Sequence, residues 1–319
     1  MSRLNPVRIP PHIVAEVDEG GLGAVDAVKV SEKKSNLWLD AWRDLRQNWL
    51  FWVSAAFILV IVFTALFPTV WTQVPPNDGC YLSKSNAPPE PGHPLGYTLQ
   101  GCDILARIVH GTSTSLSVGL IVTVLVVVMG VTLGAIAGYF GGWLDSVLMR
   151  VGDIFFAIPY VLAAVVVMSI FLAHRNVFVI SLAIGFFSWP ATARILRAEV
   201  LRVKRMEYVL ASEALGASRV KTLITHVLPN SITPVIVLST VGLAAAITAE
   251  ATLSFLGVGL PVSEIMSWGN DISAAQNNLR ANPMPLIYPS IALSVTVLAF
   301  IVLGETVREA LDPKARATR

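Results

Sequence analysis

The sequence contains few charged residues for its length. Lys, Arg, Asp and Glu make up 14% of the 319 positions, whereas hydrophobic residues make up 54% and the mean hydropathy is +0.66. Soluble globular domains carry about 25% charged residues. The scarcity of charge therefore excludes a soluble protein and predicts an integral membrane protein.

Several sequence motifs of enzymes are also missing. There is no G-x-x-x-x-G-K-[ST] loop to hold ATP, and no G-x-S-x-G turn to present a nucleophilic serine. The histidines are scattered and do not have the spacing of metal ligands; they are His12, His93, His110, His174 and His226. We therefore expect no catalytic residue, no cofactor and no metal in this chain.

Charge is sparse within the apolar runs as well. Asp153 lies at the start of one run and Glu250 at the end of another. Transporters driven by protons or ions usually carry more acids and bases within their membrane helices. Transport by this chain is therefore expected to draw its energy from another subunit, and a secondary transporter or channel that works alone is the less favoured alternative.

Long apolar runs dominate the rest of the sequence. A helix needs about 20 apolar residues to cross a bilayer, and helices satisfy their own backbone polar groups in lipid. The runs are Leu50–Phe67, Leu116–Phe140, Ile154–Ala173, the shorter Val177–Ala193, Ser231–Ala249 and Leu286–Gly304. The sequence predicts an all-α integral membrane protein with six transmembrane helices.

The residues before the first run do not have the pattern of a signal peptide. Residues 1–35 are polar and contain Pro10-Pro11 and a "GGLG" stretch, so we expect them to be disordered. From Leu37 to Trp49, apolar residues recur at helical spacing with three Trp among them. This predicts an amphipathic helix at the membrane interface, the alternative being an extension of the first membrane helix.

The basic residues predict the orientation in the membrane. Residues 1–49 hold seven Lys or Arg and residues 194–230 hold another seven, whereas loop 68–106 carries only Lys84 and loop 256–285 only Arg280. Basic loops stay in the cytoplasm. We therefore expect both termini to be cytoplasmic in a bacterial plasma (inner) membrane. Because this topology explains the basic residues, the net charge of +2 does not indicate nucleic-acid binding.

The only two cysteines, Cys80 and Cys102, lie in the loop expected outside the cell membrane, where disulfides can form. A bridge would close a loop of about twenty residues and contribute about 3 kcal/mol through the unfolded state. Spacing alone does not show that the two residues approach each other. A disulfide and two unpaired thiols both remain open.

Between Pro190 and Pro229 the sequence loses its membrane character. It contains strong helix formers and partly apolar faces. Gly216 can end one short helix in a left-handed conformation, and Ser218 can cap the next. The pattern predicts two cytoplasmic helices separated by a turn, the first presenting Ala211, Ser212, Ala214 and Leu215. Small side chains beside an apolar one suit a helix that docks in a groove on a partner. The alternative is that the stretch is an ordinary amphipathic loop.

This stretch resembles the "EAA" loop of ABC importer permeases, with the pattern E-A-A-x3-G-x9-I-x-L-P. Gly216, Leu228 and Pro229 match, as does Ala211; Leu210 and Ser212 replace the acid and the second Ala, and His226 replaces the Ile. Glu213 lies nearby but out of register. The resemblance implies a cytoplasmic coupling helix between membrane helices 4 and 5. The residues assigned to ATPase coupling are Leu210, Ala211, Ser212, Glu213, Ala214, Leu215 and Gly216.

The resemblance extends from about residue 36 to residue 313. "HPLG" (His93–Gly96), "GAIAGYFGGWLDSVLMRVGDIFFAIP" (Gly134–Pro159), "AEATLSFLGVGL" (Ala249–Leu260), "SWGN" (Ser267–Asn270) and "REALDP" (Arg308–Pro313) are similar to the C-type permease subunit of dipeptide and oligopeptide ABC importers. Tyr97, Thr98 and Cys102 depart from that pattern. The resemblance implies the type I ABC importer permease fold.

That resemblance also implies a domain organisation. It gives an N-terminal permease region at 36–110, an ABC transmembrane type-1 domain at 111–306 and a cytoplasmic tail at 307–319. The implied partners are a second permease in a heterodimer, two ATPase subunits or a fused ATPase that bind ATP and Mg, an extracytoplasmic peptide-binding protein and membrane lipid. The cargo implied is peptide, and related permeases carry nickel chelates, glutathione or short sugars.

Two further features bear on packing and on the pathway. Gly130, Gly134 and Gly138 line one face of the second membrane helix, which permits close packing within the bundle or against the partner permease. Glycines without a special purpose are the alternative. Glu250 could border the translocation path and attract the amino end of a peptide, but the favoured interpretation is a hydrogen bond to a neighbouring backbone or hydroxyl group.

Overall fold

The computed structural model describes residues 37–77, 79–262 and 264–311, which belong to one unit. Within these ranges the secondary structure is helical, and two isolated β-bridges in the outer loop are its sole strand-like pairings. The all-α prediction is thus confirmed. The disorder expected at 1–35 and most of the expected tail at 307–319 lie outside the described residues.

Five helices are long and apolar enough to cross a membrane. They are α2 (Trp49–Leu66), α3 (Ile104–Phe140), α6 (Val177–Val203), α10 (Thr233–Phe255) and α12 (Met284–Leu311). Before α2 in the sequence, α1 (Leu37–Gln47) is a separate helix. Asn48 caps the start of α2 by accepting a hydrogen bond from the Leu50 N–H at 3.0 Å. The first amphipathic segment is therefore not an extension of the first membrane helix.

The third expected span is not one continuous helix. The helices α4 (Gly142–Ala157) and α5 (Tyr160–Ile170) meet at a bend of 79°. Ile158, between them, has extended backbone angles because it precedes Pro159, whose ring disfavours the helical conformation of the preceding residue. The apolar run Ile154–Ala173 therefore covers the end of α4, the bend and α5, and the bent pair gives the expected sixth span if it is taken as one.

The helices α3 and α6 extend well beyond their apolar runs. α3 begins at Ile104, where Asp103 Oδ1 accepts a hydrogen bond from the Ala106 N–H at 2.6 Å, and it continues across the expected domain boundary at residue 110. α6 contains Pro190 and continues beyond Ala193 to Val203. An apolar run predicts only the part of a helix that faces lipid. It does not predict the helical turns at either end whose polar side chains pair with residues of other helices.

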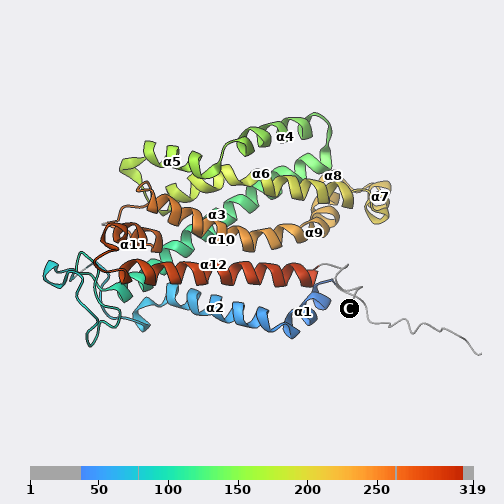
Figure 1. The fold of residues 1–319 in the computed structure, drawn as a ribbon. Coiled ribbons are helices and arrows are strands. Elements are labelled where there is room, and N and C mark those ends of the chain that lie inside the picture. The colour runs from blue at the N-terminus through green and yellow to red at the C-terminus, as the bar shows by residue number, and fades with distance from the viewer. Residues whose placement is uncertain (1–36, 78, 263, 312–319) are drawn as a thin grey trace, which may run out of the picture. The chain divides into compact units, whose positions relative to one another are not determined.

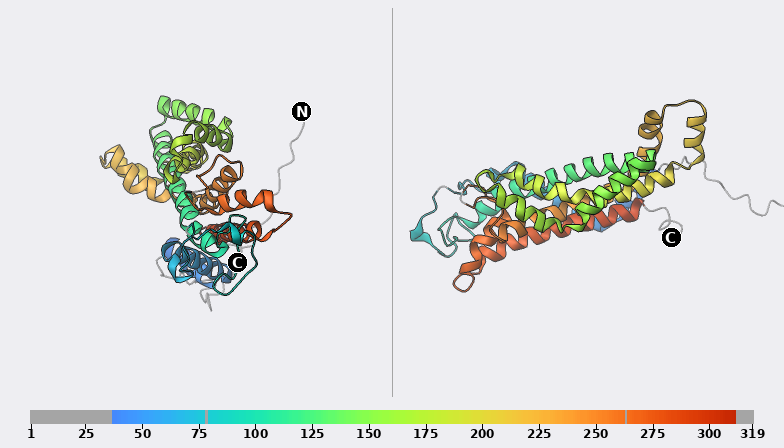
Figure 2. Two further views of the ribbon diagram at one scale, coloured as in Figure 1. Left: turned by 90° about the vertical axis from the view of Figure 1, so that its left-hand side faces the viewer. Right: turned by 90° about the horizontal axis from the view of Figure 1, so that it is seen from above.

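The centre of the bundle is formed by α3 and α6, which pack along each other, with α10 beside α3 and α12 beside α10 (Figures 1 and 2). α2 lies at the outside against α12. In its most apolar window α6 is 56% buried, whereas α2 is 6% buried. The exposed apolar surface of α2 is that of a helix facing lipid.

The two ends of the bundle differ. At one end Figure 1 shows α1, the end of α12, α7 (Glu207–Ala214) and α8 (Arg219–Thr222). The opposite end holds the loop that follows α2 and the short helix α11 (Trp268–Ala275). The shorter elements are Pro68–Val70, Leu82–Lys84, Leu172–His174, Leu223–Val227 (π-helical), α9 (Leu228–Ser231) and Gln276–Asn278.

Candidate functional site

The segment between α6 and α10 folds as a pair of short helices at one end of the bundle. After Ala214 the chain turns at Gly216, whose φ is +85°, a conformation that glycine adopts without steric cost. The Ala217 N–H donates to the Ser212 carbonyl at 3.1 Å, which closes the end of α7. Ser218 Oγ then accepts from the Lys221 N–H at 3.4 Å and caps α8. The helix–turn–helix expected from the sequence is present.

One side of α7 is open to its surroundings. Ala211, Ala214 and Gly216 are exposed there, and Ser212 is half-buried. Leu210 is 53% exposed and Leu215 is 89% exposed. This side of the helix therefore carries two largely exposed leucines.

The opposite side of α7 is fixed to the bundle. Val209 has no exposed surface and lies in a cluster with Val200, Val203 and Leu223 from the neighbouring elements. Tyr139, at the end of α3, donates its hydroxyl to Glu213 Oε1 at 2.7 Å. The sequence placed Glu213 among the coupling residues but did not indicate Tyr139, which lies 74 positions earlier.

The residues that close the loop lie in an irregular helical turn. Leu223–Val227 is π-helical and leads into α9, where Pro229 occupies the first turn. His226 and Leu228 are half-buried, Pro229 is exposed, and Asn230 Nδ2 donates to the His226 carbonyl at 2.7 Å. Because proline has no N–H, the preceding turn lacks one ordinary helical hydrogen bond, and single π turns of this kind are frequent at functional sites.

The three glycines of α3 face α6 of the same chain. A Cβ built on Gly130 would lie 2.7 Å from Thr192, one on Gly134 would lie 2.5 Å from the Ala193 carbonyl oxygen, and one on Gly138 would lie 2.9 Å from the Arg197 carbonyl oxygen. The stripe therefore serves packing within this bundle, where only a hydrogen atom fits between the two backbones.

Glu250 is fully enclosed at the junction of α3, α10 and α11. Its carboxylate accepts hydrogen bonds from Ser267 Oγ at 2.7 Å, from Ser254 Oγ at 3.0 Å and from Ser115 Oγ at 3.4 Å. The Ser115 oxygen also accepts from the Trp268 N–H at 3.3 Å. This geometry favours the structural interpretation of Glu250, and it gives the carboxylate no exposed surface on the described chain.

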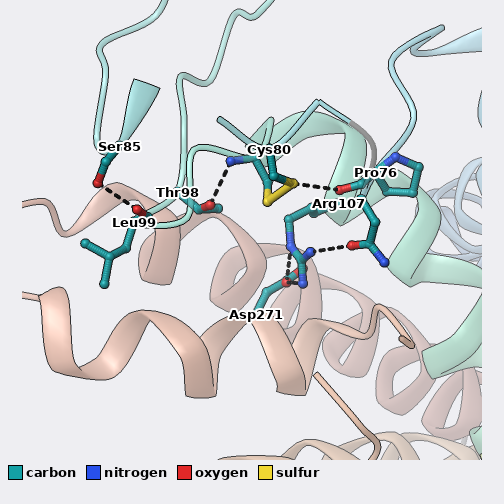
Figure 3. Close-up of a disulfide and its surroundings, with 9 residues drawn as sticks. Pro76, Cys80, Ser85, Thr98, Leu99, Arg107 and Asp271 are labelled. Atoms are coloured by element: carbon teal, nitrogen blue, oxygen red, sulfur yellow. Dashed lines mark hydrogen bonds and ion pairs between the residues drawn. A yellow bond between two sulfur atoms is a disulfide. The ribbon is translucent and has the colours of Figure 1, made fainter. Parts of the chain in front are cut away.

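The loop at the other end is closed by a disulfide between Cys80 and Cys102, whose Cα atoms are 4.2 Å apart (Figure 3). Next to it, Arg107 forms a buried ion pair with Asp271 of α11, with Nη2 at 2.6 Å and Nε at 2.7 Å from Oδ1. Arg107 Nη1 also donates to Asn77 Oδ1 at 2.9 Å. The pair joins positions 164 residues apart, and no motif in the sequence indicated it.

The same loop holds a second polar cluster. His93 of the "HPLG" motif places Nδ1 2.6 Å from Oδ2 of Asp103, the residue that caps α3. Lys84 Nζ donates to Glu90 Oε1 at 2.5 Å and to the Tyr97 hydroxyl at 2.9 Å. The hydrogen bond that Lys84 donates to Glu90 lowers the pKa of Glu90 below its ordinary value and raises the pKa of Lys84.

The described part of the chain contains a polar and an apolar cavity. The polar one, of about 540 Å³, adjoins the disulfide and is lined by Asn77, Arg107, Asp271 and Asn278 among others. The apolar one, of about 440 Å³, lies where α3, α6 and α10 meet the bend between α4 and α5. Its lining includes Phe155, Phe156, Pro159, Tyr160, Phe187 and Gly242.

The helical bundle, with an exposed helix pair at one end and a cross-linked loop at the other, is that of a multi-pass membrane protein. The family model "Binding-protein-dependent transport system inner membrane component" matches residues 130–317, and "N-terminal TM domain of oligopeptide transport permease C" matches residues 36–89. The chain belongs to the family of binding-protein-dependent ABC transporter permeases and is of the OppC-like type.

Named relatives cover nearly the whole chain. The oligopeptide transport system permease protein OppC of Bacillus subtilis is 35% identical over 92% of this chain and 95% of its own. The glutathione transport system permease protein GsiD of Pectobacterium atrosepticum is 33% identical over 88% of this chain and 92% of its own, and GsiD of Escherichia coli O157:H7 is 31% identical over 92% and 96%.

A solved structure shares the fold. A chain of the MetNI methionine ABC transporter in an inward-facing conformation superposes with a TM-score of 0.53 at 16% identity, covering 65% of this chain and 96% of that chain. The family match and the similarity to OppC show that the chain is the permease component of an ABC importer, in which ATPase activity resides in partner subunits. A transporter of this family works with ATPase and binding-protein partners in a bacterial membrane.

Proposed function

We propose that this chain is one half of the translocation pathway of an ATP-driven importer of short peptides, paired with a second, different permease. α7 is the coupling helix, and two ATPase subunits, or one fused ATPase, bind ATP and Mg and dock on it. An extracytoplasmic binding protein delivers the cargo at the opposite end. Both termini then lie in the cytoplasm with α7.

The observation that carries this proposal is the two-sided character of α7. One side is fixed to the bundle through buried Val209 and the Tyr139–Glu213 hydrogen bond, and the other presents Leu210 and Leu215 to the surroundings. A helix held in this way moves with the bundle as a rigid body when a partner displaces it. Ala211 and Gly216 lie on this helix and its turn, where small residues permit close approach.

Peptide cargo is supported by the similarity to OppC, and glutathione by the similarity to GsiD. Glutathione is itself a small peptide-like molecule, so one pathway chemistry serves both. Nickel chelates and short sugars remain further alternatives from the family resemblance. Because selectivity in such importers resides largely in the binding protein, purification of the complete complex with its bound cargo, followed by mass spectrometry, identifies the cargo class.

The coupling role is tested with two variants of the complete transporter in vesicles. Ala211→Glu places a charge in the docking contact, at a cost of several kcal/mol if the contact is dry. Gly216→Val strains the left-handed turn by about 1–3 kcal/mol. We expect either variant to insert normally but to release the ATPase or to hydrolyse ATP without uptake.

The matched control is Gly242→Ala, a glycine substitution on a membrane helix with open space around the new Cβ. It should keep the ATPase bound at the wild-type level. If Ala211→Glu and Gly216→Val both retain wild-type binding of the ATPase and wild-type uptake per ATP, α7 is an ordinary loop helix and the coupling assignment is wrong.

A further inference from the structure

Tyr139 connects α7 to the end of α3. Its hydroxyl donates to Glu213 Oε1 at 2.7 Å, and its backbone carbonyl accepts from Lys204 Nζ at 2.5 Å. The Lys204 ammonium also lies 5.4 Å from the centroid of the Tyr139 ring. The carbonyl belongs to the last turn of α3, where a cation is favourable. Tyr139 is therefore in contact with the residue that follows α6 and with the last turn of α7.

Apolar packing reinforces these contacts. Tyr139 is 3% exposed and lies in one cluster with Val200 of α6, Val209 of α7 and Leu223 of the π turn. Close-packed side chains cannot move independently, because the spaces between them are smaller than a side chain. A displacement of α7 is therefore transmitted to Tyr139 by packing and by a hydrogen bond to a charged acceptor, which is stronger than a neutral one.

A glycine junction follows directly after Tyr139 and Phe140. Gly141 and Gly142 have φ of +66° and +60°, and nothing lies within 4 Å of a Cβ built on either. α4 begins at Gly142, and the α4–α5 pair then lines the apolar cavity with residues around its bend. The end of α3 that Tyr139 fixes is thus joined to the cavity-lining pair by two residues free of side-chain contacts.

We propose that the Tyr139–Glu213 hydrogen bond passes the displacement of α7 to the α3–α4 junction, and that Glu213 is a positioning residue rather than an ATPase contact. This rests on the proposed function, in which α7 docks on an ATPase. The docking side of α7 is formed by Leu210 and Leu215, whereas Glu213 turns its carboxylate to the bundle. Glu213 thereby fixes α7 to the bundle of its own chain. At the position where the family pattern has its acid, this sequence has Leu210.

The test uses a fluorophore at the start of α4 in the complete transporter. Trp143 is 73% exposed, so Trp143→Cys accepts a maleimide dye while Cys80 and Cys102 stay bonded. In the otherwise wild-type background, adding ATP should change the dye emission. Tyr139→Phe removes the hydroxyl and keeps the ring, so we expect bound ATPase and ATP hydrolysis to persist while the ATP-induced change falls about fivefold to tenfold.

Further variants separate positioning from folding. Glu213→Ala should give the same loss, Glu213→Gln should retain most of the change because its amide oxygen still accepts, and the double variant Tyr139→Phe/Glu213→Ala should fall no further than either single one. Glu207→Ala, which removes an exposed acid from the first turn of the same helix, is the matched control and should respond as wild type.

A wild-type response in Tyr139→Phe, an equal loss in Glu207→Ala, or additive losses in the double variant would overturn the inference. A lower melting temperature with an unchanged ATP response would also overturn it, because that result shows only a structural role. Ala211→Glu distinguishes failure of this inference from failure of the proposed function. If it releases the ATPase while Tyr139→Phe responds as wild type, the coupling assignment stands and this inference fails. If Ala211→Glu also behaves as wild type, the proposed function fails with it.

Discussion

Single glycines set how closely the two central helices approach. At Gly134 the backbone of α6 lies so near that a Cβ would meet the Ala193 carbonyl oxygen at 2.5 Å and its Cα at 3.1 Å. Backbone atoms cannot rotate aside as a side chain does, so the two helices would have to separate. Helix association in lipid depends on this close contact, because there is no hydrophobic driving force between helices in hydrocarbon.

Gly134→Ala should therefore destabilise the protein by about 1–3 kcal/mol, the usual cost of overpacking. Thermal unfolding of the purified protein in detergent measures the effect. Gly242→Ala is the matched control, since its Cβ has no atom within 4 Å and alanine is the better helix former. Equal melting temperatures for Gly134→Ala and the wild type would show that the bundle adjusts without cost.

The buried ion pair between Arg107 and Asp271 is a second effect at the residue scale. Their side chains are 9% and 7% exposed, and the pair joins the first turn of α3 to α11. Each charge is costly to bury alone, so the loss of one partner leaves the other uncompensated.

Asp271→Asn and Arg107→Ala should each cost about 3–5 kcal/mol, and the double variant Arg107→Leu/Asp271→Leu should be less destabilised than either. The exposed pair between Glu305 and Arg308, with charged atoms 3.7 Å apart, offers the control. Glu305→Gln should change the stability by at most about 1 kcal/mol. The interpretation fails if the single variants of the buried pair have the same melting temperature as this control.

At the scale of elements, the loop after α2 is tied together by its own polar groups. Lys84 and Tyr97 both donate to Glu90, and the Tyr97 side chain is buried. Burial raises the pKa of Tyr97, and the hydrogen bond from Lys84 lowers the pKa of Glu90 below its ordinary value of 4.5. The folded loop therefore favours the charged form of Glu90.

The pH dependence of this stabilisation has a definite sign. The unfolded chain binds a proton at Glu90 more tightly than the folded chain, so the contribution is present above pH 4.5 and is lost as the pH falls through the lowered pKa. The difference in melting temperature between the wild type and Glu90→Gln should accordingly disappear on acidification. A difference that grows towards low pH would contradict the assignment.

For the whole molecule, the proposed orientation can be tested at the two unlike ends of the bundle. Leu82 in the cross-linked loop is 78% exposed, and Leu215 at the end of α7 is 89% exposed. The family places the chain in a membrane, and the basic residues around α7 favour the cytoplasm on its side.

In intact cells, a membrane-impermeant maleimide should label Leu82→Cys but not Leu215→Cys, and permeabilised cells should show both labelled. The wild type, whose two cysteines form a disulfide, should stay unlabelled under both conditions. Labelling of Leu215→Cys from outside would reverse the proposed orientation, and labelling of the unreduced, denatured wild type would show that Cys80 and Cys102 carry free thiols.

The sequence by itself determined the local features, which depend on residues within a few positions of one another in the chain. Apolar runs predict the membrane helices, and Gly216 with Ser218 predicts the turn between α7 and α8, because left-handed backbone angles and caps are properties of local side chains. The bend at Ile158–Pro159 had the same kind of local signal, the effect of proline on the preceding residue, but apolarity alone does not distinguish a straight helix from a broken one.

Only the tertiary structure decided which distant residues meet. The partners of Glu250, the pairing of Arg107 with Asp271 and the contact of Tyr139 with Glu213 join helices far apart in the chain. The glycine stripe likewise could have faced a partner subunit, and the structure shows that it faces α6. The periodicity of the sequence indicates which face of a helix is small or polar. Which element packs against that face depends on the path of the whole chain, and no single position determines that path.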